Sequence, residues 1–126
     1  MSNNLKYVES AYIQSANQTL SGDSVDLNNL LLIPRNILND IETPALLLYG
    51  ILMSDLLSDK SIVDYKGRHC IIYKINDIRK FLNCSYKSAW KYIKCLESKN
   101  LIHCEYLNKN KGYMFYLLVN EDIHKD

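Results

Sequence analysis

The feature that most constrains this chain is a pair of amphipathic segments joined by a tight turn, in the stretch INDIRKFLNCSYKSAWKYIKCLESK at residues 75–99. The first segment predicts a short helix with Asn76 as its N-cap. Its buried side is marked by Ile75, Ile78, Phe81 and Leu82. The next residues, Asn83 and Cys84, predict the turn, and Ser85 is suited to cap a second, longer helix. The stretch therefore predicts a helix-turn-helix.

The second helix has two chemically distinct faces when its residues are spaced by about 100°. One face is apolar and gathers Ala89, Tyr92, Ile93 and Leu96. The opposite face gathers Lys87, Lys91, Lys94 and Ser98, with Trp90 at its border. Apolar residues inward and donors outward are typical of a recognition helix, whose donors contact phosphates and base edges. A solvated surface helix carries lysines too, so the helix alone leaves both interpretations open.

The charges of the chain are unevenly distributed, although its formal net charge is only +1. Residues 1–65 hold three Lys or Arg and eight Asp or Glu, a net charge of −5. Residues 66–111 hold eleven Lys or Arg and three Asp or Glu, a net charge of +8. Residues 112–126 hold one Lys and three Asp or Glu, a net charge of −2. A basic block of this kind indicates an anionic partner, most often nucleic acid.

The first 29 residues are expected to form an N-terminal arm. Leu5, Val8 and Tyr12 recur at helical spacing, which predicts an amphipathic helix over Asn4–Ala16. The stretch up to residue 29 is rich in Ser, Asn, Gln and Asp and predicts a linker. Because a helix this short must pack on something, residues 1–29 are a candidate dimerisation element, and residues 30–126 are the expected DNA-binding domain.

The first part of that domain predicts a core helix and a hairpin. Thr43 as N-cap and Pro44 at the first helical position predict an apolar helix over Ala45–Leu57. A Lys-Gly pair then predicts a β-hairpin between the strands Ser61–Tyr65 and Arg68–Lys74. The second strand leads directly into the helix-turn-helix.

Two strands and a basic loop are expected after the helix-turn-helix. Asn100 is suited to a left-handed C-cap, and Leu101–Tyr106 and Tyr113–Val119 predict strands. The loop at residues 107–112 carries Lys109 and Lys111, which suit a phosphate backbone or a minor groove. The same residue types also occur in ordinary hairpin turns. The order of elements predicts an α+β fold, a winged helix (helix-turn-helix with a β-hairpin wing) with an extra N-terminal hairpin and a helical arm.

Several functional classes lack their signatures in this sequence. The four cysteines show no CxxC pairing, so neither a metal site nor a cofactor is expected. No Gly-rich phosphate loop, HExxH motif, Ser-based elbow or paired acid cluster occurs, so the protein is not expected to be an enzyme. Nothing resembles a signal peptide, and the longest apolar run, around Ala45–Leu57, is too short to span a bilayer. We therefore expect a cytoplasmic protein with no membrane partner.

The stretch from Ile33 to Val119 resembles the N-terminal winged-helix domain of the RepA_N-type plasmid replication initiators. The family's apolar-Pro-basic entry matches Ile33, Pro34 and Arg35. Its Ala-x-x-x-Tyr-x-x-Leu helix matches Ala45, Tyr49 and Leu52. Its Asp…Gly…apolar-apolar-Tyr hairpin matches Asp64, Gly67, Ile71, Ile72 and Tyr73. The helix-turn-helix is similar to the family's Leu-x-x-(Ser)-x-Lys-x-Ala-x-Lys pattern at Leu82, Ser85, Lys87, Ala89 and Lys91. A Leu-Glu…Leu-Ile segment closes the match at Leu96, Glu97, Leu101 and Ile102.

The resemblance implies a homodimer that binds repeated sites at a plasmid origin. Initiators of that family extend beyond this domain, so we expect either an excised DNA-binding domain or a stand-alone relative.

The leading hypothesis is a sequence-specific double-stranded DNA-binding protein of the replication initiator type, acting through the helix at 85–99 and the loop at 107–112. Its candidate DNA-binding residues are Tyr86, Lys87, Trp90, Lys91, Lys94, Lys109 and Lys111. One alternative is a stand-alone winged-helix transcriptional repressor that uses the same surface. A second is a protein-binding module, for example an inhibitor of a nucleic-acid enzyme.

Overall fold

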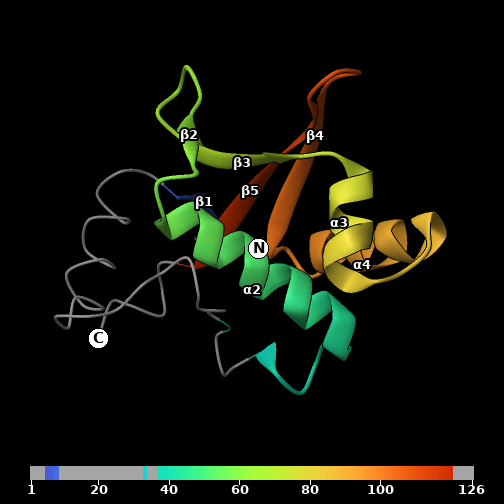
Figure 1. Cartoon of the computed structure of the whole chain (residues 1–126). Helices are drawn as coiled ribbons and strands as arrows, with labels where there is room; N and C mark the ends of the chain where they lie inside the picture. Colours follow the sequence, from blue (N-terminus) through green and yellow to red (C-terminus); the bar gives the residue numbers. More distant parts are fainter. Residues whose placement is uncertain (1–4, 9–32, 34–36, 121–126) are drawn as a thin grey trace, which may run out of the picture.

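Three helices pack against one face of an antiparallel sheet in the part of the chain that the structure describes (Figure 1). The structure is a computed structural model, and it describes residues 5–8, 33 and 37–120. The helices are α2 (Thr43–Leu57), α3 (Ile75–Leu82) and α4 (Tyr86–Ser98). The strands are β1 (Leu5–Tyr7), β2 (Ile62–Val63), β3 (His69–Tyr73), β4 (Ile102–Asn108) and β5 (Gly112–Asn120).

Strand β5 is the centre of the sheet. One of its edges pairs with β4, and its other edge is shared by β3 near its start and β1 near its end. Phe115 therefore lies between Cys104 and Ile71. The amide of His69 donates to the carbonyl oxygen of Val8 at 2.8 Å, so β1 continues the line of β3 along β5. Beyond β3, the short strand β2 forms the outer edge of the sheet.

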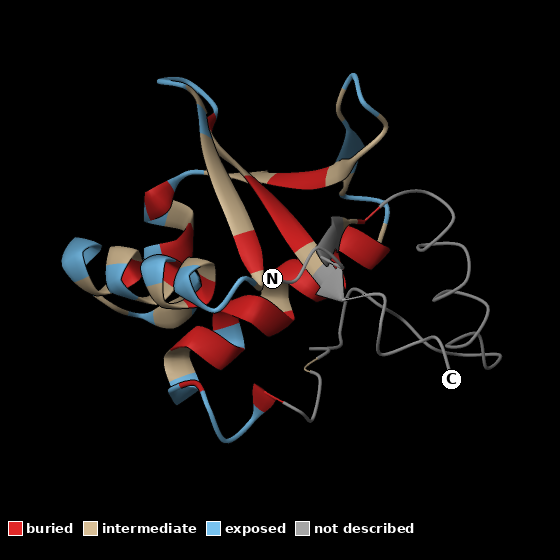
Figure 2. Ribbon diagram, turned by 180° about the vertical axis from the view of Figure 1, so that it is seen from behind, coloured by how far each residue is buried: buried red, intermediate tan, exposed pale blue. Residues whose placement is uncertain are grey.

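The hydrophobic core lies between the sheet and the helices. Phe115 and Leu117 of β5 are fully buried, and the alternation of side chains along a strand places both on the helical face. Helix α2 packs on β3 and β5, and α4 packs on α2 and α3. Figure 2 shows the buried residues concentrated where these elements meet, with exposed residues at the tips of the two hairpins. Burial of each large apolar side chain contributes about 1.5–3 kcal/mol, so this contact fixes the orientation of α4.

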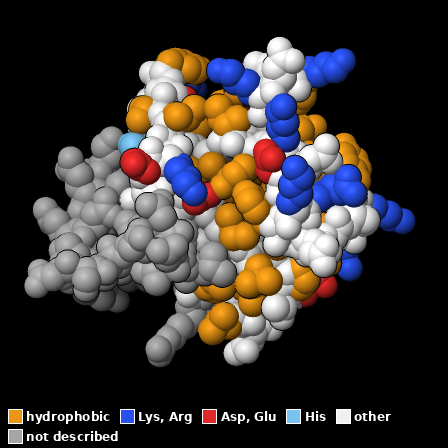
Figure 3. Space-filling view, viewed as in Figure 1, with side chains coloured by type: hydrophobic (Ala, Val, Ile, Leu, Met, Phe, Trp, Pro, Cys, Tyr) orange, Lys and Arg blue, Asp and Glu red, His pale blue; other side chains and the backbone are white. Residues whose placement is uncertain are grey.

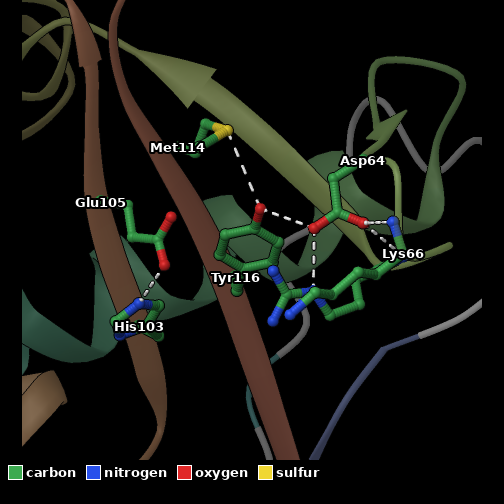
Figure 4. Close-up of polar contacts among 7 residues, drawn as sticks. Asp64, Lys66, His103, Glu105, Met114 and Tyr116 are labelled. Carbon is green, nitrogen blue, oxygen red and sulfur yellow. Dashed lines mark hydrogen bonds and ion pairs between the residues drawn. The ribbon is translucent and has the colours of Figure 1, made fainter.

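A polar and aromatic cluster occupies the opposite face of the sheet (Figure 4). The carboxylate of Asp64 accepts hydrogen bonds from the Tyr116 hydroxyl at 2.9 Å and from Arg68 Nε at 2.8 Å. The guanidinium of Arg68 also lies over the rings of Tyr7 and Tyr116, at 4.3 and 4.8 Å from their centroids. Asp64 and Arg68 together therefore connect the β2–β3 hairpin to β5 and β1.

The structure confirms the α+β winged-helix fold and most of its predicted elements. Helix α2 ends at Leu57, and the β2–β3 hairpin turns around Lys66 and Gly67 as expected. Ser85 caps α4 by accepting a hydrogen bond from the amide of Ser88 at 3.1 Å. Asn100 adopts the left-handed conformation, with φ of 59°.

The predicted helix over residues 4–16 is wrong at its start. Leu5–Tyr7 form strand β1, because pairing with the open edge of β5 satisfies their backbone groups. Residues 9–16 of that segment lie outside the described residues, as does the dimerisation role of residues 1–29. The structure describes a strand, and no helix, at the start of this arm.

Three local details also differ from the predictions. Helix α3 begins at Ile75 with Lys74 as N-cap, not Asn76, because the Asp77 carboxylate accepts from the Lys74 amide at 3.1 Å. Helix α2 begins at Thr43, and its N-cap is Glu42. Phe81 is exposed rather than buried, because it lies about 90° around α3 from its apolar stripe.

Candidate nucleic-acid interface

Helix α4 presents a row of lysines to solvent. Its inward residues Ala89, Ile93 and Leu96 are fully buried in the core. The opposite face holds Lys87, Lys91 and Lys94, which we call the lysine face, and all three are exposed. The side chains of Lys91 and Lys94 are 64% and 71% exposed. The predicted division into an apolar and a basic face is confirmed, so three cations stand on one rigid surface.

Two carboxylates lie beside the lysine face. Lys91 Nζ is 3.7 Å from the Glu42 carboxylate at the start of α2. Lys94 Nζ is 3.6 Å from the Glu97 carboxylate one turn further along α4. Exposed pairs of this kind contribute about 0–1 kcal/mol, so a more strongly charged anion can compete for both lysines.

The hairpin formed by β4, residues 109–111 and β5 is the wing. The amide of Lys111 donates to the Asn108 side chain at 2.8 Å, which closes the tip. Gly112 follows with φ of 97°, a conformation that glycine adopts readily. Lys109 and Lys111 are both exposed at this tip. The wing therefore presents two further cations on a defined turn.

Hydrogen bonding and ring contacts hold the wing against α4. Glu97 Oε2 accepts a hydrogen bond from the amide of Cys104 in β4 at 3.0 Å. The ring of Trp90 meets the ring of Tyr113 edge to face, with centroids 5.1 Å apart. Tyr113 makes a similar contact with Tyr106, at 5.3 Å. Burial, with a contribution from Glu97, raises the pKa of the Cys104 thiol to about 12, so this thiol is neutral at the joint.

A surface pocket separates the start of α4 from the root of the wing. Tyr86 lines it from α4, Tyr106 and Tyr113 line it from the wing, and Lys74 and Lys109 add two amines. Tyr86 and Tyr106 are 55% and 61% exposed. The pocket shows that the helix and the wing border one continuous surface.

The basic side chains are concentrated around these elements. In Figure 3, Lys and Arg gather on the right-hand side of the molecule, where Figure 1 places α3, α4 and the wing. The middle of the same view, over α2, is mainly apolar. The lysines of α4 and the wing are therefore assembled into one region of the surface, whereas Lys66 and Arg68 of the same basic block belong to the β2–β3 hairpin.

The predicted site residues fall into two groups in the structure. Lys87, Lys91 and Lys94 share the outer face of α4, whereas Tyr86 and Lys109 meet at the pocket. Trp90 is half-buried and packs against the core. Its predicted role as a DNA contact therefore has an alternative, which is packing at the edge of the core.

Three residues at this surface, Tyr106, Lys74 and Glu42, were not predicted from the sequence. Alternation along β4 places Tyr106 on the helical face of the sheet, opposite Tyr113. That alternation could have predicted the position of Tyr106 from the sequence. The pairing of Glu42 with Lys91 depends on how α2 packs against α4, which no local pattern reveals.

No group of three or more His, Cys, Asp or Glu side chains in the described residues is arranged to hold a metal ion. None of the helices in that part of the chain has the length and apolar character needed to cross a membrane.

Comparison with known proteins finds the fold in solved structures. No protein-family profile matches the chain, and no curated protein matches it significantly. A structure described as the N-terminal domain of a DNA binding protein matches with a TM-score of 0.55 and 22% identity, over 95% of this chain and 91% of that one. A structure described as a Rep-DNA complex matches with a TM-score of 0.57 and 22% identity, over 95% and 92% of the two chains. At this identity the likeness shows a shared fold.

Proposed function

We propose that this protein is a sequence-specific double-stranded DNA-binding protein of the plasmid replication initiator type. The proposal rests on the exposed lysine face of α4 and the basic wing, which lie on the same side of the molecule (Figures 1 and 3). A helix of this shape fits the major groove, and a basic hairpin beside it suits the adjacent backbone. The protein acts by binding, with no catalytic step of its own.

The two parts of the surface have different roles. Lys87, Lys91 and Lys94 enter or flank the major groove, where lysine donates to guanine O6 and N7. Lys109 and Lys111 neutralise phosphates and set the orientation of the protein on the duplex. The helix therefore supplies sequence preference, and the wing supplies sequence-independent affinity.

The initiator type is proposed from the resemblance of residues 33–119 to RepA_N-type proteins. The solved structure described as a Rep-DNA complex has the same fold, which is consistent with this assignment. Recognition of repeated origin sites by a homodimer follows from the resemblance. A transcriptional repressor would use the same surface, and its target sites would lie in a promoter instead of an origin.

Duplex binding tests the proposal. A randomised duplex library is enriched on the wild-type protein, and the selected duplex is titrated by fluorescence anisotropy at two salt concentrations. Changing both Lys87 and Lys91 to alanine is expected to cost about 1–3 kcal/mol per base-reading residue and to relax the sequence preference. Lys66→Ala, which removes an exposed lysine at the tip of the β2–β3 hairpin, is the matched control and is expected to bind normally.

The salt dependence separates DNA binding from the protein-binding alternative. A duplex-binding protein loses affinity steeply as salt rises, because lysine contacts release counterions from the DNA. Lys109→Ala with Lys111→Ala is expected to weaken binding to all sequences and to reduce that slope. Weak, salt-insensitive duplex binding by the wild type would contradict the proposal and favour a protein-binding module.

A further inference from the structure

We propose that the pocket between the start of α4 and the root of the wing binds one unpaired base of single-stranded DNA. The inference rests on the proposed function, because the same basic surface holds the backbone on either side of that base. It adds a second DNA ligand, a single strand, to the duplex.

The walls of the pocket are aromatic and accessible. Tyr86 and Tyr106 line it from opposite elements, and both side chains are more than half exposed. Tyr113 also lines the pocket and is held in place by edge contacts to Tyr106 and Trp90. Exposed tyrosines on a rigid support are the groups on which unpaired bases stack, with little dependence on sequence.

Amide donors line the same pocket. The side-chain oxygen of Asn108 already accepts from Lys111, and that of Asn76 already accepts from Arg79 Nη1 at 3.1 Å. Their amide groups can therefore donate to the carbonyl oxygens and ring nitrogens on the edge of a base. Such edges are open to a protein when the base is unpaired.

Charge and size favour a single nucleotide unit. Lys74 and Lys109 line the pocket, and its lining includes no Asp or Glu, which suits the phosphates that flank a base. The volume is about 220 Å³. That is below the roughly 300 Å³ at which pockets for drug-sized ligands begin, so the space suits one aromatic ring system. A paired base has both faces covered by its neighbours and cannot enter it.

The test compares two single strands of equal charge with a duplex. Labelled oligothymidylate, an abasic oligonucleotide of the same length and the selected duplex are titrated by anisotropy against the full chain. Wild type is expected to bind oligothymidylate about tenfold or more tightly than the abasic strand, because only the first can stack. Quenching of Trp90 fluorescence by oligothymidylate gives a second signal, since Trp90 contacts Tyr113 in the pocket wall.

Matched variants locate the contact. Tyr106→Ala is expected to lower the oligothymidylate affinity about tenfold, whereas Tyr106→Phe keeps the stacking ring and the affinity. Tyr65→Ala removes a tyrosine that is exposed on the β2–β3 hairpin, away from the pocket, and is expected to have no effect. A thermal melt of each variant checks that it is folded.

The outcomes separate this inference from the proposed function. Equal binding of the abasic strand and oligothymidylate, or an unchanged affinity in Tyr106→Ala, would overturn the base pocket. Duplex binding without any single-strand binding would also overturn it while leaving the proposed function intact. Absence of binding to all three probes would overturn both.

Discussion

Glu97 in the last turn of α4 accepts a hydrogen bond from the backbone amide of Cys104 in the wing, at 3.0 Å. The other oxygen of the same carboxylate lies 3.6 Å from Lys94 Nζ. One side chain therefore connects the lysine face, the helix that carries it and the first strand of the wing. This contact fixes the distance between the two parts of the proposed DNA-binding surface.

Glu97→Ala is expected to destabilise the protein by about 1–3 kcal/mol, because it leaves the Cys104 amide without its acceptor. Urea denaturation measures the loss, and faster hydrogen exchange at the Cys104 amide locates it. Glu97→Gln keeps a carbonyl oxygen at the same place and is expected to retain most of the stability. Equal losses in the two variants would mean that the charge of Glu97, not its acceptor, matters.

Gly112 joins the wing to the rest of the sheet at a point where no side chain fits. A Cβ atom at this position would lie 2.5 Å from the Tyr73 carbonyl oxygen, and φ is +97°. Gly67 has a similar φ of +82° but no atom within 4 Å of such a Cβ. Gly67→Ala is therefore the control for the backbone conformation alone. It is expected to lower the free energy of unfolding by about 1–2 kcal/mol. Gly112→Ala is expected to lose clearly more free energy of unfolding, and similar losses would argue against the close approach.

Local patterns in the sequence were sufficient for much of the fold. The period of the apolar residues, the cap at Ser85 and the left-handed Asn100 predicted α4 and its two faces, because those features depend on neighbours along the chain. The wing was predicted from the strand pattern of its two strands and from the basic loop between them. The lysines of the candidate site were predicted for the same reason.

Features that depend on tertiary contact were missed. Leu5, Val8 and Tyr12 recur at helical spacing, but pairing with the open edge of β5 places Leu5–Tyr7 in a strand. The pocket was missed because Tyr86 and Tyr106 are brought together only when the wing folds back on α4. No spacing in the sequence encodes that distance.

Glu42 is expected to weaken DNA binding by holding Lys91. Its carboxylate lies 3.7 Å from Lys91 Nζ, and both groups are exposed. Glu42→Gln releases the lysine and removes a like charge near the phosphates, so duplex affinity is expected to rise by up to about fivefold, within the range of an exposed ion pair. Asp40→Asn makes the same charge change nearby and is the control. In a Lys91→Ala background the gain is expected to shrink, and an undiminished gain there would rule out the pairing as its cause.

Asp64 is expected to make folding stability depend on acid pH. Burial alone would raise the pKa of Asp64, but hydrogen bonds from the Arg68 amide, the Tyr116 hydroxyl and the Arg68 guanidinium outweigh it and lower the pKa from 3.8 to about 2. The unfolded chain therefore takes up a proton between about pH 4 and pH 2 that the native carboxylate does not. The contribution of Asp64 is fully present above pH 4 and is lost as the pH falls toward 2. Urea denaturation should show wild type more stable than Asp64→Asn at pH 6, with the difference closing toward pH 2. A difference that is constant over this range would contradict the lowered pKa.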